Sequence, residues 1–433
     1  MGIGWLLVGM ILFPVLAQGG LDRCDQINRV SWLFLFCLLA VAMMIRNVWA
    51  ALCVGMIAAG MLTVVPKSDV WQRAGLPALA AATAYAALTP KVTAAHLVPV
   101  LWAFVAVGCW TGAWTAYSRF QGFVSYMRWW PHPPTPGMWW PPIVFHEDSP
   151  THLKAGQGNA NHLQGTAVLC TAAMVALAFL GQRAALLAWP LVVLPLVVRV
   201  NKEGRWGQGL LHLATLVVSA AGVASGKASV LLLLLTLYVV ALCLWAKPWR
   251  PRTDWFDGGR FGMWRTILTD GWKPLTWRRK VFGLGTGTWQ PWSTPLTVPK
   301  HGGVIFTTAH NEYLQWLVEH GIVGLVFLSC YLFFGLVRLW QGGVLGHALL
   351  LVCLTLLSVA MTNFPWTFFH SIERPPECLT CKKPVVAMAG SPRHPAECQC
   401  EPPKAQAVTP YYVGSPALVA MSLVLAILVE AFK

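Results

Sequence analysis

The sequence predicts an all-α integral membrane protein, because its charged residues are few and its apolar residues occur in long blocks. Of 433 residues, 56% are hydrophobic and only 11% are charged. Soluble domains carry roughly 25% charged residues, so this chain has too few charges to solvate the surfaces of several soluble domains. Cytoplasmic enzymes, disordered proteins and fibrous proteins are therefore excluded.

The apolar blocks approach the length of about 20 residues with which a helix crosses about 30 Å of hydrocarbon. Charged residues, prolines and glycines separate the blocks, which predicts about twelve membrane spans. Two of them, Leu76–Leu88 and Ala184–Val198, are short and flanked by proline. In chain order, the expected spans are Ile3–Ala17, Val30–Ile45, Val48–Val65, Leu76–Leu88, Leu97–Tyr117, Leu163–Leu180, Ala184–Val198, Leu210–Ala224, Val230–Trp245, Tyr313–Leu339, Val344–Met361 and Val413–Phe432.

We expect one polytopic membrane domain over residues 1–433, interrupted by three long connections of the kind that is usually functional or disordered. The first connection, residues 118–161, is rich in tryptophan and proline. Its tryptophans suit either an aromatic belt at the membrane interface or a platform on which sugar rings stack. The second connection, residues 247–312, is large and basic, and the third, residues 363–412, contains cysteines.

The net charge of +15 indicates a negatively charged partner. In a polytopic membrane protein, anionic membrane lipids or a phosphorylated substrate are expected ahead of nucleic acid. The N-terminal block lacks the basic start and the cleavage site of a signal peptide, so we expect it to be a retained helix. The basic residues of the short connections are divided between both sides, so the positive-inside rule does not give the orientation.

The segment from Thr307 to Phe327 contains the most informative polar residues. His310 and Asn311 lie where a loop enters a long apolar helix, and Glu319 follows about two turns later. A carboxylate in a membrane helix is costly, so Glu319 is either a functional residue or an inward group paired with a basic side chain. The positive end of the helix dipole disfavours protonation of His310, which suits a general base. The alternative is an exposed loop histidine without a function.

Four motifs in the same order resemble the O-antigen ligase and O-antigen polymerase superfamily, and they cover roughly residues 156–328. The matching residues are Asn159, Asn161 and His162 before a membrane helix; Arg260 and Trp264; Gly283, Gly285 and Gly287; and His310, Asn311, Tyr313, Leu314, Glu319, Gly321 and Gly324. In the last motif, Gly321 and Gly324 are expected to permit close helix contact.

The resemblance implies a multi-pass glycosyltransferase of the bacterial inner membrane, with its active site on the extracytoplasmic face. It implies transfer of a glycan from a polyprenyl pyrophosphate carrier to an acceptor, which is a lipid A core sugar, another glycan or a protein side chain. It also implies that arginines bind the pyrophosphate and that a loop histidine acts near the acceptor, and by motif match these roles fall on Arg260 and His310. The other candidate residues are Glu319 as a catalytic residue, and Arg265, Asn311, Asn161 and Lys227 as substrate-binding residues.

The composition of the basic loop, residues 247–312, is consistent with a pyrophosphate leaving group. Guanidinium groups stabilise such a charge without a metal ion. The loop's acidic residues Asp254, Asp257 and Asp270 form no evident magnesium site, so we expect no cofactor and metal-independent transfer. The alternative is a basic cluster that rests on anionic lipid headgroups. The loop's glycines either bring backbone amides close to phosphate or form tight turns.

Lys227 departs from the family pattern. The family has a Ser-Arg-Gly-Ala-like element where this chain reads Ser225-Gly226-Lys227-Ala228. An ammonium group lacks the planar fork of an arginine, so its contact with phosphate would differ. One expected span separates Lys227 from the basic loop, which places the two on opposite membrane faces. Either the alignment is shifted or Lys227 is structural.

The cysteines of the third connection lie in two close pairs, Cys378 with Cys381 and Cys398 with Cys400. On an oxidising face of the membrane we expect them to form two disulfides. A structural zinc site is the alternative, because two close cysteine pairs are also a zinc pattern. The resemblance gives no counterpart for this region.

A non-enzymatic transporter or flippase of lipid-linked or anionic substrates is the alternative function. Such proteins place charged residues near the membrane midplane, often within repeated halves. In this chain the polar residues gather in loops and at helix ends, and no repeat is evident. The pattern therefore favours the enzyme.

Overall fold

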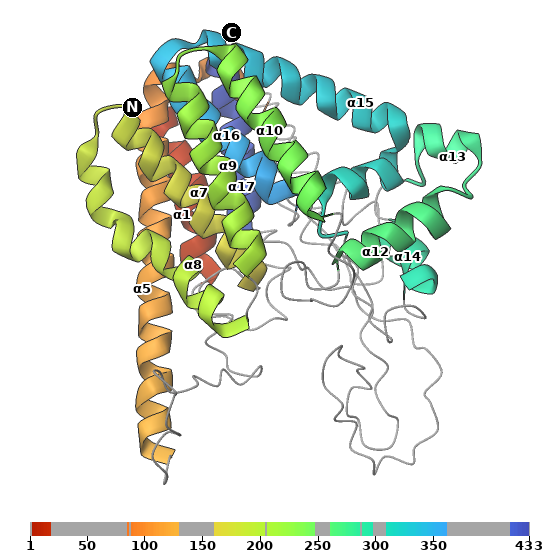
Figure 1. Ribbon diagram of the computed structural model, residues 1–433. Coiled ribbons are helices and arrows are strands. Elements are labelled where there is room, and N and C mark those ends of the chain that lie inside the picture. Colours follow the sequence, from red (N-terminus) through yellow and green to blue (C-terminus); the bar gives the residue numbers. More distant parts are fainter. Residues whose placement is uncertain are drawn as a thin grey trace, which may run out of the picture.

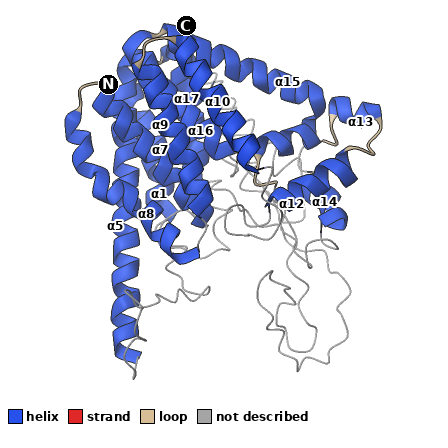
Figure 2. Cartoon of the chain, viewed as in Figure 1, coloured by secondary structure: helices blue, strands red, loops and turns tan. Residues whose placement is uncertain are grey.

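The computed structural model describes residues 2–18, 85, 88–129, 160–203, 206–246, 260–285, 288–297, 309–361 and 416–432. Every element in these ranges is helical, and none of the described residues forms a strand (Figure 2). The predicted all-α class is therefore confirmed for the described part of the chain. The cysteines Cys378, Cys381, Cys398 and Cys400 lie outside the described residues, as does most of the tryptophan-rich connection.

Nine of the predicted apolar blocks coincide with described helices. The helices of the bundle are α1 (Gly2–Gln18), α5 (Leu97–Trp129), α7 (Ala160–Phe179), α8 (Trp189–Glu203), α9 (Trp206–Ala224), α10 (Ala228–Ala246), α15 (Glu312–Gln341), α16 (Gly343–Ala360) and α17 (Pro416–Val429), followed by the short helix η6 (Glu430–Phe432). Within the described residues, three segments are long and apolar enough to cross a membrane: Ala94–Ala113, Glu312–Gln341 and Gly343–Ala360. Blocks Val30–Ile45 and Val48–Val65 lie outside the described residues, as does Leu76–Leu88 except for Tyr85 and Leu88, so the total of about twelve spans stays a prediction.

Helix α7 lies in the centre of the bundle and packs against α5, α8 and α16 (Figure 1). Small residues allow the close approach on the α5 side. A Cβ atom at Gly108 would clash with Cys170 of α7, and one at Gly112 would clash with the backbone of Leu191 in α8. Packing between membrane helices depends on such small residues, because lipid tails are as apolar as the helices themselves.

The basic connection, predicted as a loop over residues 247–312, contains short helices. They are α12 (Arg260–Thr266), the π-helical segment η5 (Ile267–Trp272), α13 (Trp277–Phe282) and α14 (Trp289–Thr297). Helices α12, α13 and α14 lie beside the bundle, and α15 leads from them back to it (Figure 1). These short helices therefore surround the start of α15, where the sequence places His310.

Candidate functional site

His310 adopts an unusual backbone conformation at the start of α15. Its φ of 48° lies in the left-handed region, and it is the one non-glycine residue with a positive φ among the described residues. Such a conformation is strained for most side chains and persists where the surroundings enforce it. The next residue, Asn311, caps α15, since its side-chain oxygen accepts a hydrogen bond from the backbone N–H of Leu314 at 3.0 Å.

Ala309, the residue before His310, is held on both sides of its backbone. Its carbonyl oxygen accepts a hydrogen bond from Nε1 of Trp264 at 2.6 Å, and its N–H donates to Oε1 of Gln315 at 3.3 Å. Trp264 belongs to α12 and Gln315 to the first turn of α15, so two elements fix this residue. Their contacts impose the backbone path that leads into the left-handed conformation of His310.

A small hydrophobic core lies beneath the site, separate from the core of the bundle. We call it the loop core; its buried members are Met263, Ile267, Trp289, Ala309, Leu314 and Val318. They come from α12, η5, α14 and the first half of α15, and Trp264 packs against them. Short helices of six to nine residues are not stable alone. The loop core is therefore what gives the site a defined shape.

Glu319 lies in the same region, with its carboxylate directed at the start of α14. Its Oε1 accepts a hydrogen bond from the backbone N–H of Trp289, the first residue of α14, at 3.2 Å. Both residues are buried, with exposed fractions of 7% and 1%. A carboxylate at a helix N-terminus is stabilised by the unpaired N–H groups and by the helix dipole. This contact explains how an acidic residue is accommodated in an apolar helix.

The two glycine motifs meet at a kink in α15. Gly321 has φ 70° and ψ −171°, which interrupts the helix, and a Cβ atom there would clash with the carbonyl oxygen of Val281. The N–H groups of Leu284 and Gly285 donate to the carbonyl oxygens of Val318 and Glu319 at 3.0 and 2.9 Å. These amides are therefore used within the protein. Of the two predicted roles for the glycine segment, the tight turn is the one the geometry supports at these positions, since Gly283 and Gly285 have positive φ values of 82° and 106°.

Gly324 makes room within its own helix. A Cβ atom there would clash with the side chain of His320 and would approach Nε1 of Trp316. The Trp316 and His320 rings pack against each other, with centroids 4.5 Å apart. Gly321 thus permits the expected close contact with another helix, α13, whereas Gly324 makes room for this ring pair within α15 itself.

Tyr313 joins the site to the bundle. Its hydroxyl donates a hydrogen bond to the carbonyl oxygen of Leu357 at 3.1 Å, near the end of α16. The last four carbonyl groups of a helix have no partner within it, so this contact satisfies one of them. The start of α15 is therefore fixed both to the loop core and to α16.

The cations around the site lie on the short helices. Arg260 is the first residue of α12, and its side chain is outside what the structure describes. Arg265, five residues later, is exposed, and Arg278 and Arg279 are exposed on α13. Because Trp264 of α12 contacts Ala309, the structure brings α12 and its arginines to the same region as His310, Asn311 and Glu319.

Two other predicted residues are not brought to this region by described contacts. Lys227 is exposed in the turn between α9 and α10, where its N–H donates to Oγ of Ser225. The 19 residues of α10 separate it from the basic connection, a length of roughly 28 Å at 1.5 Å per residue. Asn161 is in the first turn of α7, and its side chain is not described.

The site also contains residues whose roles the sequence pattern does not reveal. Trp289 and Leu357 contact Glu319 and Tyr313 through backbone atoms, which no side-chain pattern reveals. Gln315 had a detectable signal, because it lies one turn from both Asn311 and Glu319 on the same helix face. Among the described residues, no group of three or more His, Cys, Asp and Glu side chains is placed to hold a metal ion.

Comparison with known families places a domain over this region. Residues 166–329 match the family model described as O-antigen ligase. The match spans α7 to the middle of α15, less than half of the chain, and includes His310, Glu319 and the loop core. Comparison with curated proteins finds no match, and comparison with solved structures finds none either.

Proposed function

From the O-antigen ligase domain at residues 166–329, we propose that this integral membrane protein is a glycosyltransferase of the ligase or polymerase type. It transfers a glycan from a polyprenyl pyrophosphate carrier to an acceptor hydroxyl or amide. The acceptor is a lipid A core sugar, another glycan or a protein side chain. The enzyme lies in the bacterial inner membrane, and its active site faces the extracytoplasmic side.

One observation supports this proposal above the others: His310 is held in a strained backbone conformation by contacts on both sides. Trp264 and Gln315 fix Ala309, and Asn311 caps the helix that follows. Strained residues gather at functional sites, where the surrounding structure maintains them. A positive φ is uncommon outside glycine, and at His310 the contacts of the neighbouring residues maintain it.

In the proposed reaction, His310 is the general base. The imidazole takes the proton of the acceptor hydroxyl as the oxygen attacks the anomeric carbon of the donor sugar. The bond between that carbon and the phosphate oxygen breaks, and the pyrophosphate leaves with the electron pair. The positive end of α15 lies beside His310, which disfavours the protonated imidazole and keeps the base available.

The leaving group is stabilised by cations. We assign this role to Arg260 and Arg265 of α12, which the contact between Trp264 and Ala309 joins to the His310 region. Guanidinium groups bind phosphate oxygens in pairs, so the developing charge is met by fixed donors without a metal ion. Asn311 contributes by fixing the start of α15.

Glu319 is assigned a positioning role in this proposal. Its carboxylate is buried and holds the N–H of Trp289, so a reacting sugar does not reach it without displacing α14. Catalysis requires reacting groups to be fixed closely, and small displacements cost much of the rate. Glu319 therefore supports the reaction indirectly, because it holds α14 in the loop core on which the position of His310 depends.

The direct test uses the purified full-length protein in lipid nanodiscs with a polyprenyl pyrophosphate-linked oligosaccharide and a set of acceptors. Mass spectrometry of the products is expected to show the oligosaccharide attached to one acceptor class, with release of polyprenyl pyrophosphate. Movement of the intact donor across vesicle membranes, without transfer, would contradict the enzyme and support a flippase.

A further inference from the structure

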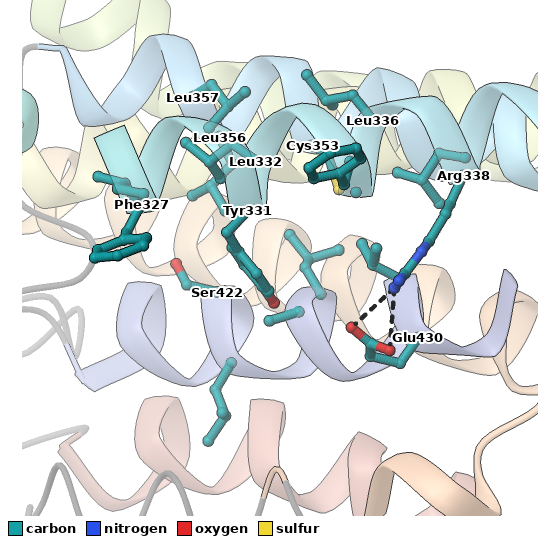
Figure 3. A pocket seen from close by; sticks show the side chains of 18 of the residues that line it. Phe327, Tyr331, Leu332, Leu336, Arg338, Cys353, Leu356, Leu357, Ser422 and Glu430 are labelled. Atoms are coloured by element: carbon teal, nitrogen blue, oxygen red, sulfur yellow. Dashed lines mark hydrogen bonds and ion pairs between the residues drawn. The ribbon is translucent and has the colours of Figure 1, made fainter. Parts of the chain in front are cut away.

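A cavity of about 710 Å³ lies between α15, α16 and α17. Ligand pockets typically have volumes of roughly 300 to 1,000 Å³, so this cavity has the size of a binding site. In Figure 3, Phe327 and Ser422 lie at one end of the view, and Arg338 and Glu430 lie at the other. Most of the side chains that line it between these ends are apolar.

The residues on the two facing helices explain why this space is open. Helix α15 contributes Gly335, and α17 contributes Ser422 and Ala426, all small residues. The Ser422 hydroxyl donates a hydrogen bond to the carbonyl oxygen of Leu418 in its own helix, so this donor does not need an acceptor from a ligand. Large side chains such as Phe327 and Tyr331 stand at the edge, where they are 71% and 48% exposed. In a membrane helix these exposed side chains face lipid.

The end near Arg338 is closed by polar groups that satisfy one another. Arg338 and Glu430 form an ion pair with a nitrogen–oxygen distance of 3.3 Å (Figure 3), and the Tyr85 hydroxyl donates to Glu430 at 2.7 Å. A charge placed in an apolar environment is costly unless it is paired, and here it is paired. This end therefore needs no ligand and acts as a wall.

The opposite end of the cavity reaches the candidate active site. Trp316, which lines it, lies six residues after His310 on the first half of α15. Leu357, also a lining residue, accepts the hydrogen bond from Tyr313. The cavity thus begins where the reacting end of a lipid-linked donor would lie.

At this end of the cavity, Trp316 favours a ligand that carries a hydrogen-bond acceptor. Its indole N–H is buried and has no hydrogen-bond partner among the described residues. A buried donor without an acceptor is costly, and such groups are uncommon unless a ligand or water completes them. The lining therefore fits a molecule that is hydrocarbon over most of its length and carries an oxygen acceptor at the Trp316 end.

We infer that this cavity binds the lipid chain of the glycan donor, with the phosphate-bearing end at Trp316 and the hydrocarbon directed toward Arg338. The inference rests on the proposed function and adds the binding site of the lipid. Binding there places the pyrophosphate beside His310 and makes the enzyme selective for donors with a long chain.

The test compares two donors that carry the same glycan, one on a long polyprenyl pyrophosphate and one on a chain of two isoprene units. Leu332→Trp and Ala426→Trp fill the cavity, and Val326→Trp is the matched control, because Val326 is exposed on α15 and does not line it. The cavity-filling variants are expected to raise KM for the long-chain donor about tenfold and to change short-chain transfer by less than about twofold. Val326→Trp is expected to leave KM for both donors unchanged.

Long-chain KM values within about twofold of wild type in both cavity-filling variants would overturn the inference. Wild-type protein that transfers glycan from neither donor would instead refute the proposed function.

A second measurement uses the wild-type protein, in case the large substitutions disturb folding. A donor with a diazirine at the far end of its long chain is expected to label peptides of α15 and α17 around Leu332 and Ala426. Excess unlabelled donor should compete, and a phospholipid with a diazirine on its acyl chain should label these peptides weakly. Equal labelling by the phospholipid, or labelling spread evenly over all apolar helices, would show that the cavity is not a donor site.

Discussion

Glu319 accepts a hydrogen bond from the backbone N–H of Trp289 at 3.2 Å, and both residues are buried. The two residues are far apart in sequence, and their contact joins α15 to α14 across the loop core. Because α12, α14 and the first half of α15 share this core, the position of His310 depends on the contact. The carboxylate that the sequence marks as a candidate catalytic residue thus holds the site together.

This role predicts different outcomes for two substitutions of Glu319. Glu319→Gln keeps an oxygen that accepts from Trp289, so we expect it to retain more than about a tenth of the transfer rate. Glu319→Ala leaves the N–H without an acceptor and should lower the free energy of unfolding by about 1 to 3 kcal/mol. Thermal unfolding in detergent and single-turnover transfer assays measure both effects. A fully stable Glu319→Gln protein with less than about a hundredth of the activity would indicate a direct catalytic role.

His310→Asn should reduce glycan transfer without reducing the stability of the protein. Asparagine, like histidine, is among the non-glycine residues most often found in the left-handed conformation, so the variant should be about as stable as the wild type. The loss of a general base should reduce transfer by about 10²- to 10⁴-fold. The matched control is His347→Asn, since His347 contacts the Trp340 carbonyl oxygen, away from the active site, and should keep activity within about twofold. A His310→Asn enzyme with more than about a tenth of wild-type activity would exclude the imidazole as the base.

The sequence predicts the bundle helices well and the site less completely, because the helices follow from local hydropathy and the site depends on contacts between distant residues. Hydropathy is a local property, so the expected span Val344–Met361 differs from α16, Gly343–Ala360, by one residue at each end. The short helices of residues 260–297 depend on the loop core, which gathers residues that are distant in sequence. No local pattern predicts α14, with nine residues and an internal proline, as a helix.

The motif around His310 illustrates the same limit. Its spacing predicts that His310 and Asn311 begin a helix, and the structure confirms Asn311 as the cap. The contacts that bend the backbone at His310 come from Trp264 and Gln315, and only the folded structure brings Trp264 there. The presence of Gly321 is visible in the sequence, but its positive φ is not, because glycine also occurs in ordinary helix contacts.

Arg260→Lys should impair the enzyme although it conserves charge. A lysine offers a single ammonium in place of the planar fork that binds two phosphate oxygens, so kcat/KM is expected to fall at least about tenfold. Arg183→Lys is the matched control, because Arg183 is exposed in the segment between α7 and α8 of the bundle. That control should stay within about twofold. Equal donor affinity for Arg260→Lys and wild type would remove Arg260 from the phosphate site.

Transfer should persist in excess EDTA. The proposed leaving-group site uses guanidinium groups, whereas a magnesium site usually needs one or two carboxylates together with substrate phosphates. The measurement is the initial rate of transfer by purified enzyme in nanodiscs before and after chelation. Activity that disappears in EDTA and returns with Mg²⁺ or Mn²⁺ would show that a metal ion stabilises the pyrophosphate.

Gly321→Ala should disrupt the site more than its small change in volume suggests. Gly321 has φ 70° and ψ −171°, a conformation reserved for glycine, and a Cβ atom would clash with the Val281 carbonyl oxygen. The variant can relieve the clash only by moving α13 away, which breaks the hydrogen bonds from Leu284 and Gly285 to α15. We expect transfer to fall at least about tenfold and the melting temperature of the purified protein to drop by several degrees.

Gly9→Ala is the matched control, inside α1. A Cβ atom at Gly9 would meet no atom within 4 Å, and an alanine favours the helix by about 1 kcal/mol over glycine. This control should therefore be as stable as the wild type and should transfer glycan normally. Hydrogen exchange of the segment 281–285 reports the kink directly. If Gly321→Ala matched Gly9→Ala in stability, exchange and transfer, the kink would not be needed to position His310, and the link between the glycine motifs and the active site would be wrong.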